Sequence, residues 1–243
     1  MRLGGVQPSY LPWLGYFEQI YRTDVFILCD ELQYEIYSWR NRNKIKTKDS
    51  WMWLTVPVPS SNIFGKPIKD IKIAYNRDWR RKHWLSLARH YNRAPFFKNY
   101  RDFFEEVYKT KWEFLAELDI EIIRELCRSL GIKTELVVSS QLKLEEKFRR
   151  FYKNGDATDR LIFYCKEFGA DIFYEGEAGK NYIDEQKTKD NAITLEYQTY
   201  RHPVYPQRGA DFTPYLSVVD LLFNCGEKSL DILADRSLAP SRE

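Results

Sequence analysis

Two short apolar segments near the start of the chain, residues 3–7 and 25–29, constrain the fold most strongly. Each has the length of a buried strand, and apolar side chains recur at helical spacing in residues 14–21 between them. Strand, helix and strand in this order favour an α/β sheet. The loop after each strand then lies at the carboxyl edge of the sheet, where such folds bind ligands. We therefore expect a binding crevice that includes Gln7, Tyr10 and Asp30.

The rest of the chain continues this pattern. Apolar runs predict further strands at residues 51–58, 68–73, 135–140, 171–174 and 193–197. Helical spacing predicts helices within residues 76–93, 101–126, 156–168 and 213–225, with a charged connector at 143–154. The expected fold class is α/β, with a mixed sheet in a layered α/β domain and a helical insertion around residues 76–130. We expect a single α/β domain over residues 1–234 and a disordered tail over 235–243.

Cap residues mark the ends of two of these helices. Asp156 or Thr158 is expected to cap the helix that Gly169 ends. The last helix is expected to begin at Thr213 and Pro214 and to stop at Gly226.

Charge differs between the two central helices. Residues 76–93 carry six Lys and Arg against one Asp, whereas residues 101–126 carry eight acidic side chains against four basic ones. We expect these opposite charges to pair on the surface. His83 and His90 lie in the basic helix and are expected to face solvent.

The overall charge balance limits the classes of partner. A total of 38 basic and 35 acidic residues gives a net charge of +3, which argues against a nucleic acid or a membrane surface. No apolar run approaches the roughly 18 residues of a membrane span, and Met1 leads into the first strand without a signal-peptide pattern. No residues have metal-ligand spacing, so no dedicated metal site is expected. The separated cysteines are expected to be reduced, buried thiols of a cytoplasmic protein: Cys29, Cys127, Cys165 and Cys225.

A basic run and nearby aromatic residues indicate a ligand pocket. Residues 40–48 contain five cations and no acid. Guanidinium groups match phosphate oxygens, and asparagine amides bond to sugar hydroxyls; the alternative is a solvated basic loop. Aromatic residues make up 16% of the chain, and those in polar loops either line pockets or anchor the loops. The expected substrate-binding residues here are Trp13, Tyr16, Arg40, Asn41, Arg42, Asn43 and Lys44.

His202 is the first candidate for proton transfer. It lies between prolines, close in sequence to Tyr205 and Gln207, which we expect to contact substrate. The ordinary pKa of a histidine lies near neutrality, which suits a general base; the alternative is a structural histidine.

Glu175 and Asp30 are the second and third candidates, because each ends a predicted strand. The loop after Glu175 carries Glu177 and Lys180, expected substrate ligands, but lacks the Gly and Ser/Thr of a P-loop. A surface turn and a backbone cap are the structural alternatives.

Motifs in residues 7–17, 39–45, 51–57, 91–97 and 202–226 occur in one order along nearly the whole chain. The first reads QPSYLPWLGYF and the last begins HPVYPQ. Together they resemble the WbqC-like family. One departure is Val6, where many members carry histidine, so no role of that histidine is carried over. The resemblance implies bacterial surface-polysaccharide biosynthesis of the O-antigen type, often involving amino sugars, and a transferase role.

Three functional hypotheses follow. The first is a cytoplasmic transferase that modifies an amino-sugar nucleotide, by acyl or aminoacyl transfer to the sugar amine. The expected substrate is a small, nucleotide-linked molecule, and the sequence identifies no further cofactor. The sequence does not decide whether a divalent ion is used or how many chains assemble. The first alternative is a nucleotidyltransferase-like enzyme using ATP or CTP. The second is a non-enzymatic nucleic-acid or complex-binding module that uses residues 40–48 and 76–93.

Overall fold

The computed structural model describes residues 1–209 and 211–234, and its backbone groups into two compact units. Unit 1 comprises residues 1–7, 18–32 and 133–201. Unit 2 comprises the described residues of 8–17, 33–132 and 202–234. The tail expected to be disordered lies outside the described residues, and the single domain expected from the sequence stays a prediction.

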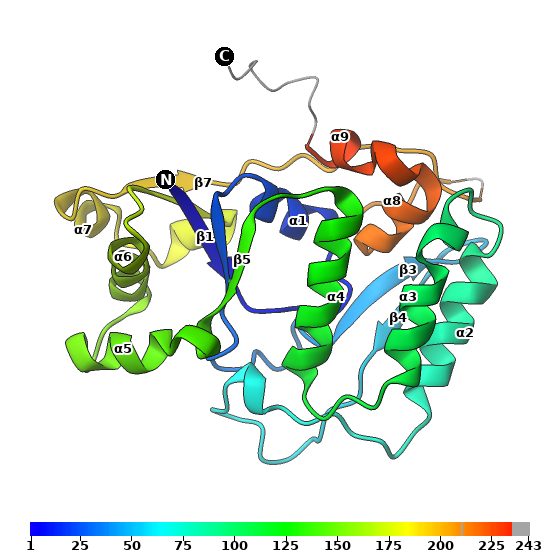
Figure 1. Ribbon diagram of the computed structural model, residues 1–243, viewed down its shortest axis with the longest axis horizontal. Helices are drawn as coiled ribbons and strands as arrows, with labels where there is room; N and C mark the ends of the chain where they lie inside the picture. The colour runs from blue at the N-terminus through cyan, green and yellow to red at the C-terminus, as the bar shows by residue number, and fades with distance from the viewer. Residues whose placement is uncertain (210, 235–243) are drawn as a thin grey trace. The chain divides into compact units, whose positions relative to one another are not determined.

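A five-stranded parallel sheet forms the centre of unit 1 (Figure 1). Its strands, in spatial order, are β5 (Glu135–Val138), β2 (Val25–Leu28), β1 (Arg2–Val6), β6 (Ile172–Glu175) and β7 (Thr194–Tyr197). All neighbouring pairs run parallel. The chain adds strands to one side of β1 and then to the other, so β1 and β6 flank a topological switch point. The expected α/β fold is therefore confirmed.

Helices of unit 1 pack against this sheet through an apolar core that includes Leu3, Ile27, Leu161 and Phe173. These helices are α5 (Leu144–Phe151), α6 (Ala157–Phe168) and α7 (Glu185–Asp190). Helix α6 has the ends predicted from the sequence: its N-cap Asp156 accepts a hydrogen bond from the Asp159 N–H, and it stops at Gly169. The expected charged connector instead contains α5.

Unit 2 contains a two-stranded antiparallel sheet and a group of helices (Figure 1). The strands are β3 (Arg42–Lys46) and β4 (Trp51–Thr55). The helices are α2 (Trp79–Tyr91), α3 (Phe97–Lys109), α4 (Leu115–Leu130), α8 (Val218–Cys225) and α9 (Ser229–Ala234). Helix α1 (Leu14–Tyr21) has residues in both units.

Phe223 lies at the centre of the unit 2 core. Its ring packs edge-on against Tyr91, Phe97 and Phe104, with ring centroids 5.1–5.7 Å apart. The described helices are all too short or too polar to cross a membrane.

Several local expectations were wrong. The basic segment expected as a loop forms β3, because it pairs along its whole length with β4. Among the described strands, β3 and β4 pair antiparallel in this separate hairpin and the strands of the larger sheet pair parallel, so a single mixed sheet was not found. Residues 68–73 contain a 3-10 turn, Ile68–Asp70, instead of a strand. The last long helix begins after its N-cap Ser217 and not at residue 213, although it ends at Gly226 as predicted.

Helix α2 also differs from expectation. Its buried residues recur every four positions as Trp79, His83, Leu87 and Tyr91, so His83 is buried and does not face solvent. Among the described residues, no ion pair joins α2 to α3 or α4. The Glu105 carboxylate of α3 pairs within its own helix, with Arg101 and Lys109. The expected surface pairing between these helices is therefore wrong.

Candidate functional site

Backbone hydrogen bonds between distant segments of unit 2 build the frame of a pocket. The Tyr10 N–H donates to the Arg40 carbonyl at 2.9 Å, and the Ser217 N–H donates to the Lys44 carbonyl at 2.9 Å. These bonds hold the N-terminal loop, the start of β3 and the segment before α8 together.

The pocket has a volume of about 380 Å³, within the range of small-molecule sites. Four aromatic side chains and six other residues line it. The aromatic ones are Trp13, Tyr16, Trp39 and Tyr215, and the others are Ser9, Pro12, Glu35, Ser38, Arg40 and Asn43. Trp13, Tyr16, Arg40 and Asn43 are thus brought together as the sequence predicted. We call this the aromatic pocket.

Local packing fixes the aromatic wall. The rings of Trp13 and Tyr215 lie 5.9 Å apart between centroids. The indole of Trp13 covers Gly15, where a Cβ atom would lie 2.3 Å from the ring, so this ring position requires glycine. Asn43 is buried and donates from Nδ2 to the Leu11 carbonyl at 2.6 Å, which anchors the opposite wall.

An ion pair contributes the charged part of the pocket. Arg40 donates to Glu35 Oε2 from Nε at 3.1 Å and approaches the same oxygen with Nη2 at 2.9 Å. Its Nη1 donates to Ser9 Oγ at 2.9 Å. In the described part of the chain, Glu35 Oε1 has no bonded partner. The guanidinium therefore holds the carboxylate by one oxygen, and the Glu35 side chain is 53% exposed.

Two other cations of the predicted phosphate run, Arg42 and Lys44, lie against tryptophan rings. Lys44 Nζ is 4.2 Å from the Trp51 centroid and 5.2 Å from that of Trp53. The guanidinium of Arg42 lies 4.8 Å from the Trp53 centroid and donates to the Tyr37 carbonyl. These positive charges are stabilised by the ring faces.

Asn41, from the same run, donates from Nδ2 to the Val56 carbonyl at 2.9 Å and so ties β3 to the segment after β4. Its predicted contact with substrate stays a prediction.

A buried chain of polar groups includes Tyr10. The Tyr10 hydroxyl lies 2.8 Å from His83 Nδ1 and 2.5 Å from the Tyr108 hydroxyl. Burial lowers the pKa of His83 to about 4, partly opposed by a hydrogen bond to the Thr55 carbonyl. Tyr10 is fully buried, so it supports the pocket loop from beneath.

The predicted residues near the C-terminus order the loop before α8. His202 Nδ1 bonds to the Pro203 carbonyl, and Nε2 accepts from the Tyr215 N–H at 3.1 Å. Gln207 bonds to the backbone of Thr213 through both amide atoms. Tyr205 donates to Asp220, and burial lowers the pKa of His202. His202 thereby positions Tyr215 at the aromatic pocket.

The carboxyl edge of the unit 1 sheet carries Gln7, Asp30 and Glu175, as predicted from the strand ends. Asp30 accepts from the Ser139 hydroxyl at 2.8 Å and from the hydroxyl and N–H of Ser140 at 2.6 and 2.9 Å. Its carboxylate is therefore a cap for the turn after β5.

Glu175 at the same edge has a perturbed acidity. Burial raises its pKa to about 7, although the Gly176 N–H, 2.9 Å away, stabilises the charged form. A carboxyl group with this pKa can accept or donate a proton near neutrality. Glu177 and Lys180 follow on the exposed turn, where Lys180 Nζ lies 3.7 Å from Glu177 Oε1.

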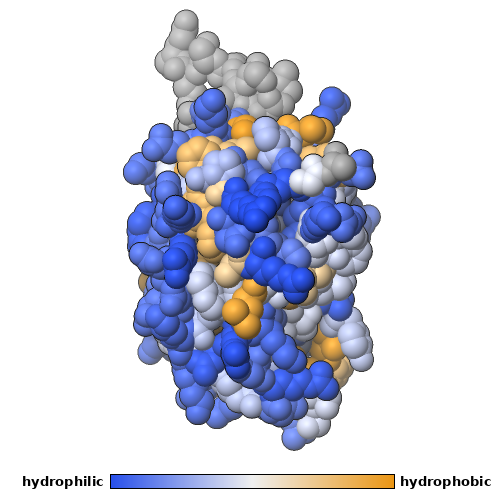
Figure 2. Space-filling view, turned by 90° about the vertical axis from the view of Figure 1, so that its right-hand side faces the viewer, coloured by the Kyte–Doolittle hydropathy of each residue, from blue (hydrophilic) through white to orange (hydrophobic). Residues whose placement is uncertain are grey.

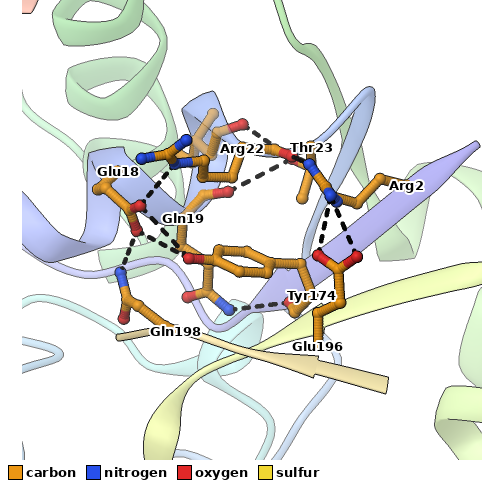
Figure 3. A network of polar contacts seen from close by, with 9 residues as sticks. Arg2, Glu18, Gln19, Arg22, Thr23, Tyr174, Glu196 and Gln198 are labelled. Carbon is orange, nitrogen blue, oxygen red and sulfur yellow. Dashed lines mark hydrogen bonds and ion pairs between the residues drawn. The ribbon is translucent and has the colours of Figure 1, made fainter. Parts of the chain in front are cut away.

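A second carboxylate of unit 1, Glu18, is fully engaged in a polar network (Figure 3). It accepts from Arg22 Nε at 2.9 Å, Gln198 Nε2 at 2.6 Å and the Tyr174 hydroxyl at 3.3 Å. Arg2 pairs with Glu196 nearby (Figure 3). This network joins α1 to strands β6 and β7. The role of Glu18 is therefore structural.

Sequence reasoning missed several groups. Glu35, Trp39 and Tyr215 line the aromatic pocket, and only the aromatic content of the loops hinted at them. Asp119 on α4 is fully buried, and neither carboxylate oxygen has a partner among the described residues. Burial raises the pKa of Asp119 well above its usual range. No group of His, Cys, Asp and Glu able to hold a metal ion occurs in the described ranges.

A family model and one relative match nearly the whole chain. The model of the WbqC-like protein family matches residues 7–232. An uncharacterized protein of Mycobacterium tuberculosis, Rv1507c, is 33% identical over 232 residues, which cover 94% of this chain and 95% of that protein. No solved structure matches the chain. The chain therefore belongs to the WbqC-like protein family, as its motifs indicated.

Proposed function

We propose that this WbqC-like protein is a transferase that modifies an amino-sugar nucleotide for a bacterial surface polysaccharide of the O-antigen type. The reaction is acyl or aminoacyl transfer to the sugar amine, in the cytoplasm. The observation that carries the proposal is the aromatic pocket, in which ring faces and a half-engaged carboxylate converge.

The pocket suits one sugar ring. Trp13, Tyr16 and Trp39 offer ring faces for the C–H faces of a pyranose, and the Ser9 hydroxyl offers a hydrogen bond to a sugar oxygen. The volume of about 380 Å³ admits a sugar.

Glu35 supplies the preference for an amino sugar. Arg40 holds the carboxylate through Oε2, so Oε1 accepts a hydrogen bond from the sugar nitrogen. During transfer, the nitrogen lone pair attacks the acyl carbonyl carbon and the bond from that carbon to the donor's leaving group breaks. The proton lost from nitrogen passes to Glu35 Oε1 and then to water. The catalytic roles expected for His202, Glu175 and Asp30 stay predictions beside this one.

Calorimetry with two sugar nucleotides tests the assignment. UDP-glucosamine carries a free amine, whereas the amine of UDP-N-acetylglucosamine is capped, so the wild-type protein is expected to bind UDP-glucosamine more tightly. Glu35→Gln is expected to abolish that preference. The matched control is Glu113→Gln, since Glu113 is another exposed carboxylate paired with a cation, Lys72, at 2.8 Å. Trp39→Ala is expected to weaken binding of both sugars about tenfold. Equal affinities for the two sugars in the wild-type protein would contradict the proposal.

A further inference from the structure

A second pocket of unit 2 is lined by basic side chains from three segments. Its volume is about 370 Å³. The cations come from the end of β3 and its turn, from the end of α2 and from the loop before α8: they are Lys46, Lys48, Arg89, Arg93 and Arg208. Figure 2 looks onto the side where α2 lies and shows strongly hydrophilic side chains over much of that face. We call this second site the basic pocket.

Most of this positive charge is uncompensated. Among residues 1–209 and 211–234, the side chains of Lys48, Arg89, Arg93 and Arg208 have neither an ion pair nor a hydrogen bond. No ion pair joins these side chains to the described residues of the acidic helices α3 and α4, and the Glu105 carboxylate of α3 pairs with Arg101 and Lys109 of its own helix. Like charges gathered around a hollow repel one another, so an anion that enters it is attracted by all of them.

Helix stability explains only part of the cluster. Arg89 and His90 lie in the last turn of α2, where cations complement the partial negative charge of the helix end. That effect does not account for Lys48 and Arg208, which come from other segments.

The floor of the pocket is rigid. The Lys46 N–H donates to the Tyr91 hydroxyl at 2.9 Å, and that hydroxyl donates to the buried carboxylate of Asp220 at 2.8 Å. The ammonium of Lys46 donates to the Asp211 carbonyl and to Thr213 Oγ1. Strand β3, helix α2 and the loop before α8 are thereby fixed at one point.

A glycine brings Arg208 against the β3 turn. Gly209 has a φ of +103°, which other residues rarely adopt, and a Cβ atom there would lie 2.9 Å from the Lys48 carbonyl oxygen. The close approach of these two backbones places the side chains of Arg208 and Lys48 at the same hollow.

We propose that the basic pocket binds a ligand carrying two or more adjacent phosphate groups. Guanidinium forks bind phosphate oxygens in pairs and ammonium groups add point charges, which suits the charge of a diphosphate better than that of one phosphate. The ligand is a small molecule, because the chain's net charge of +3 gives little attraction for a long polyanion.

The basic pocket is separate from the aromatic pocket. Asn43 lines the aromatic pocket and Lys46 the basic one, and side chains three residues apart on a strand point to opposite faces. The inference therefore does not depend on the proposed function.

Calorimetry with pyrophosphate, UDP, coenzyme A and inorganic phosphate tests this inference. Pyrophosphate is expected to bind at least tenfold more tightly than inorganic phosphate. Whichever of UDP and coenzyme A binds more tightly identifies the kind of molecule that carries the diphosphate. Two double variants are each expected to weaken pyrophosphate binding at least tenfold. One combines Lys48→Gln with Arg208→Gln, and the other combines Arg89→Gln with Arg93→Gln. Circular dichroism is expected to show that these variants fold, because Lys48, Arg89 and Arg93 are exposed and Arg208 is only half-buried.

The control neutralises two arginines of α5, Arg149→Gln with Arg150→Gln, which pair with glutamates of their own helix. It is expected to bind pyrophosphate as the wild-type protein does, and so is Trp39→Ala, which separates this site from the aromatic pocket. Equal losses in the control and in the pocket variants would overturn the proposal. So would tight binding of a short RNA in the absence of pyrophosphate binding.

Discussion

Glu175→Gln is expected to stabilise the protein at pH 8 and to leave its stability unchanged below pH 4.5. Burial raises the pKa of Glu175 from 4.5 to about 7 in the folded chain. Below pH 4.5 the carboxyl group is protonated in both states. As the pH rises from 4.5 to 7, the unfolded chain releases this proton first, so the wild-type protein loses stability over that window.

The size of the effect follows from the shift. Above pH 7 the wild-type penalty reaches about 3 kcal/mol, at about 1.4 kcal/mol per unit of pKa. Glutamine has the same shape and still accepts from the Gly176 N–H, so it removes the penalty and keeps that contact.

Denaturant unfolding, followed by circular dichroism at pH 4.5, 6 and 8, measures the difference between variant and wild type. Glu177→Gln is the matched control, since Glu177 is an exposed neighbour on the same turn, and it is expected to give no pH-dependent difference. If Glu175→Gln is less stable than the wild-type protein at pH 8, the burial of Glu175 does not destabilise the folded chain. The same holds if its free energy of unfolding differs from that of the wild type by the same amount at all three pH values.

Three further outcomes are expected. Tyr10→Phe leaves His83 Nδ1 and the Tyr108 hydroxyl without their shared partner and should cost about 1–3 kcal/mol in denaturant unfolding, whereas Tyr37→Phe on the exposed surface should cost less than about 0.5 kcal/mol. His83, with its pKa lowered to about 4, should stay neutral between pH 5.5 and 8, and a titrating ring signal in that range by NMR would contradict this. Phe223→Ala should lower the free energy of unfolding by about 3–5 kcal/mol because the core rings around it lose their common contact; a loss below 1 kcal/mol would contradict that packing.

The α/β class and the buried strands were predictable because the signal of a buried strand is local. A strand covered on both faces is a continuous apolar run, and the run at Val25–Leu28 shows this without knowledge of its neighbours. The ends of such strands then placed Asp30 and Glu175 at the carboxyl edge. Strand β3 could not be recognised in this way, because its charges are stabilised by rings of another segment. Lys44 pairs across the hairpin with Trp53, a contact that no local pattern reveals.

The aromatic pocket was only partly predictable for the same reason. Trp13 and Arg40 occur in motifs with unusual composition. Glu35 meets Arg40 through a side-chain ion pair, and the Tyr215 N–H donates to His202 Nε2, and neither contact has a local sequence pattern. His83 was misassigned although its signal was present: it precedes the buried Leu87 by four residues, on the same helix face.

Native mass spectrometry with a mixed panel of ligands shows which class of ligand the protein binds. The panel contains several amino-sugar nucleotides, UDP, TDP, ATP and a short RNA, presented to the wild-type protein and to Trp13→Ala. We expect selective retention of an amino-sugar nucleotide by the wild-type protein and loss of that selectivity in Trp13→Ala, because this ring forms one wall of the aromatic pocket. Retention of ATP or RNA alone, or an amino-sugar complex that Trp13→Ala leaves intact, would contradict that expectation.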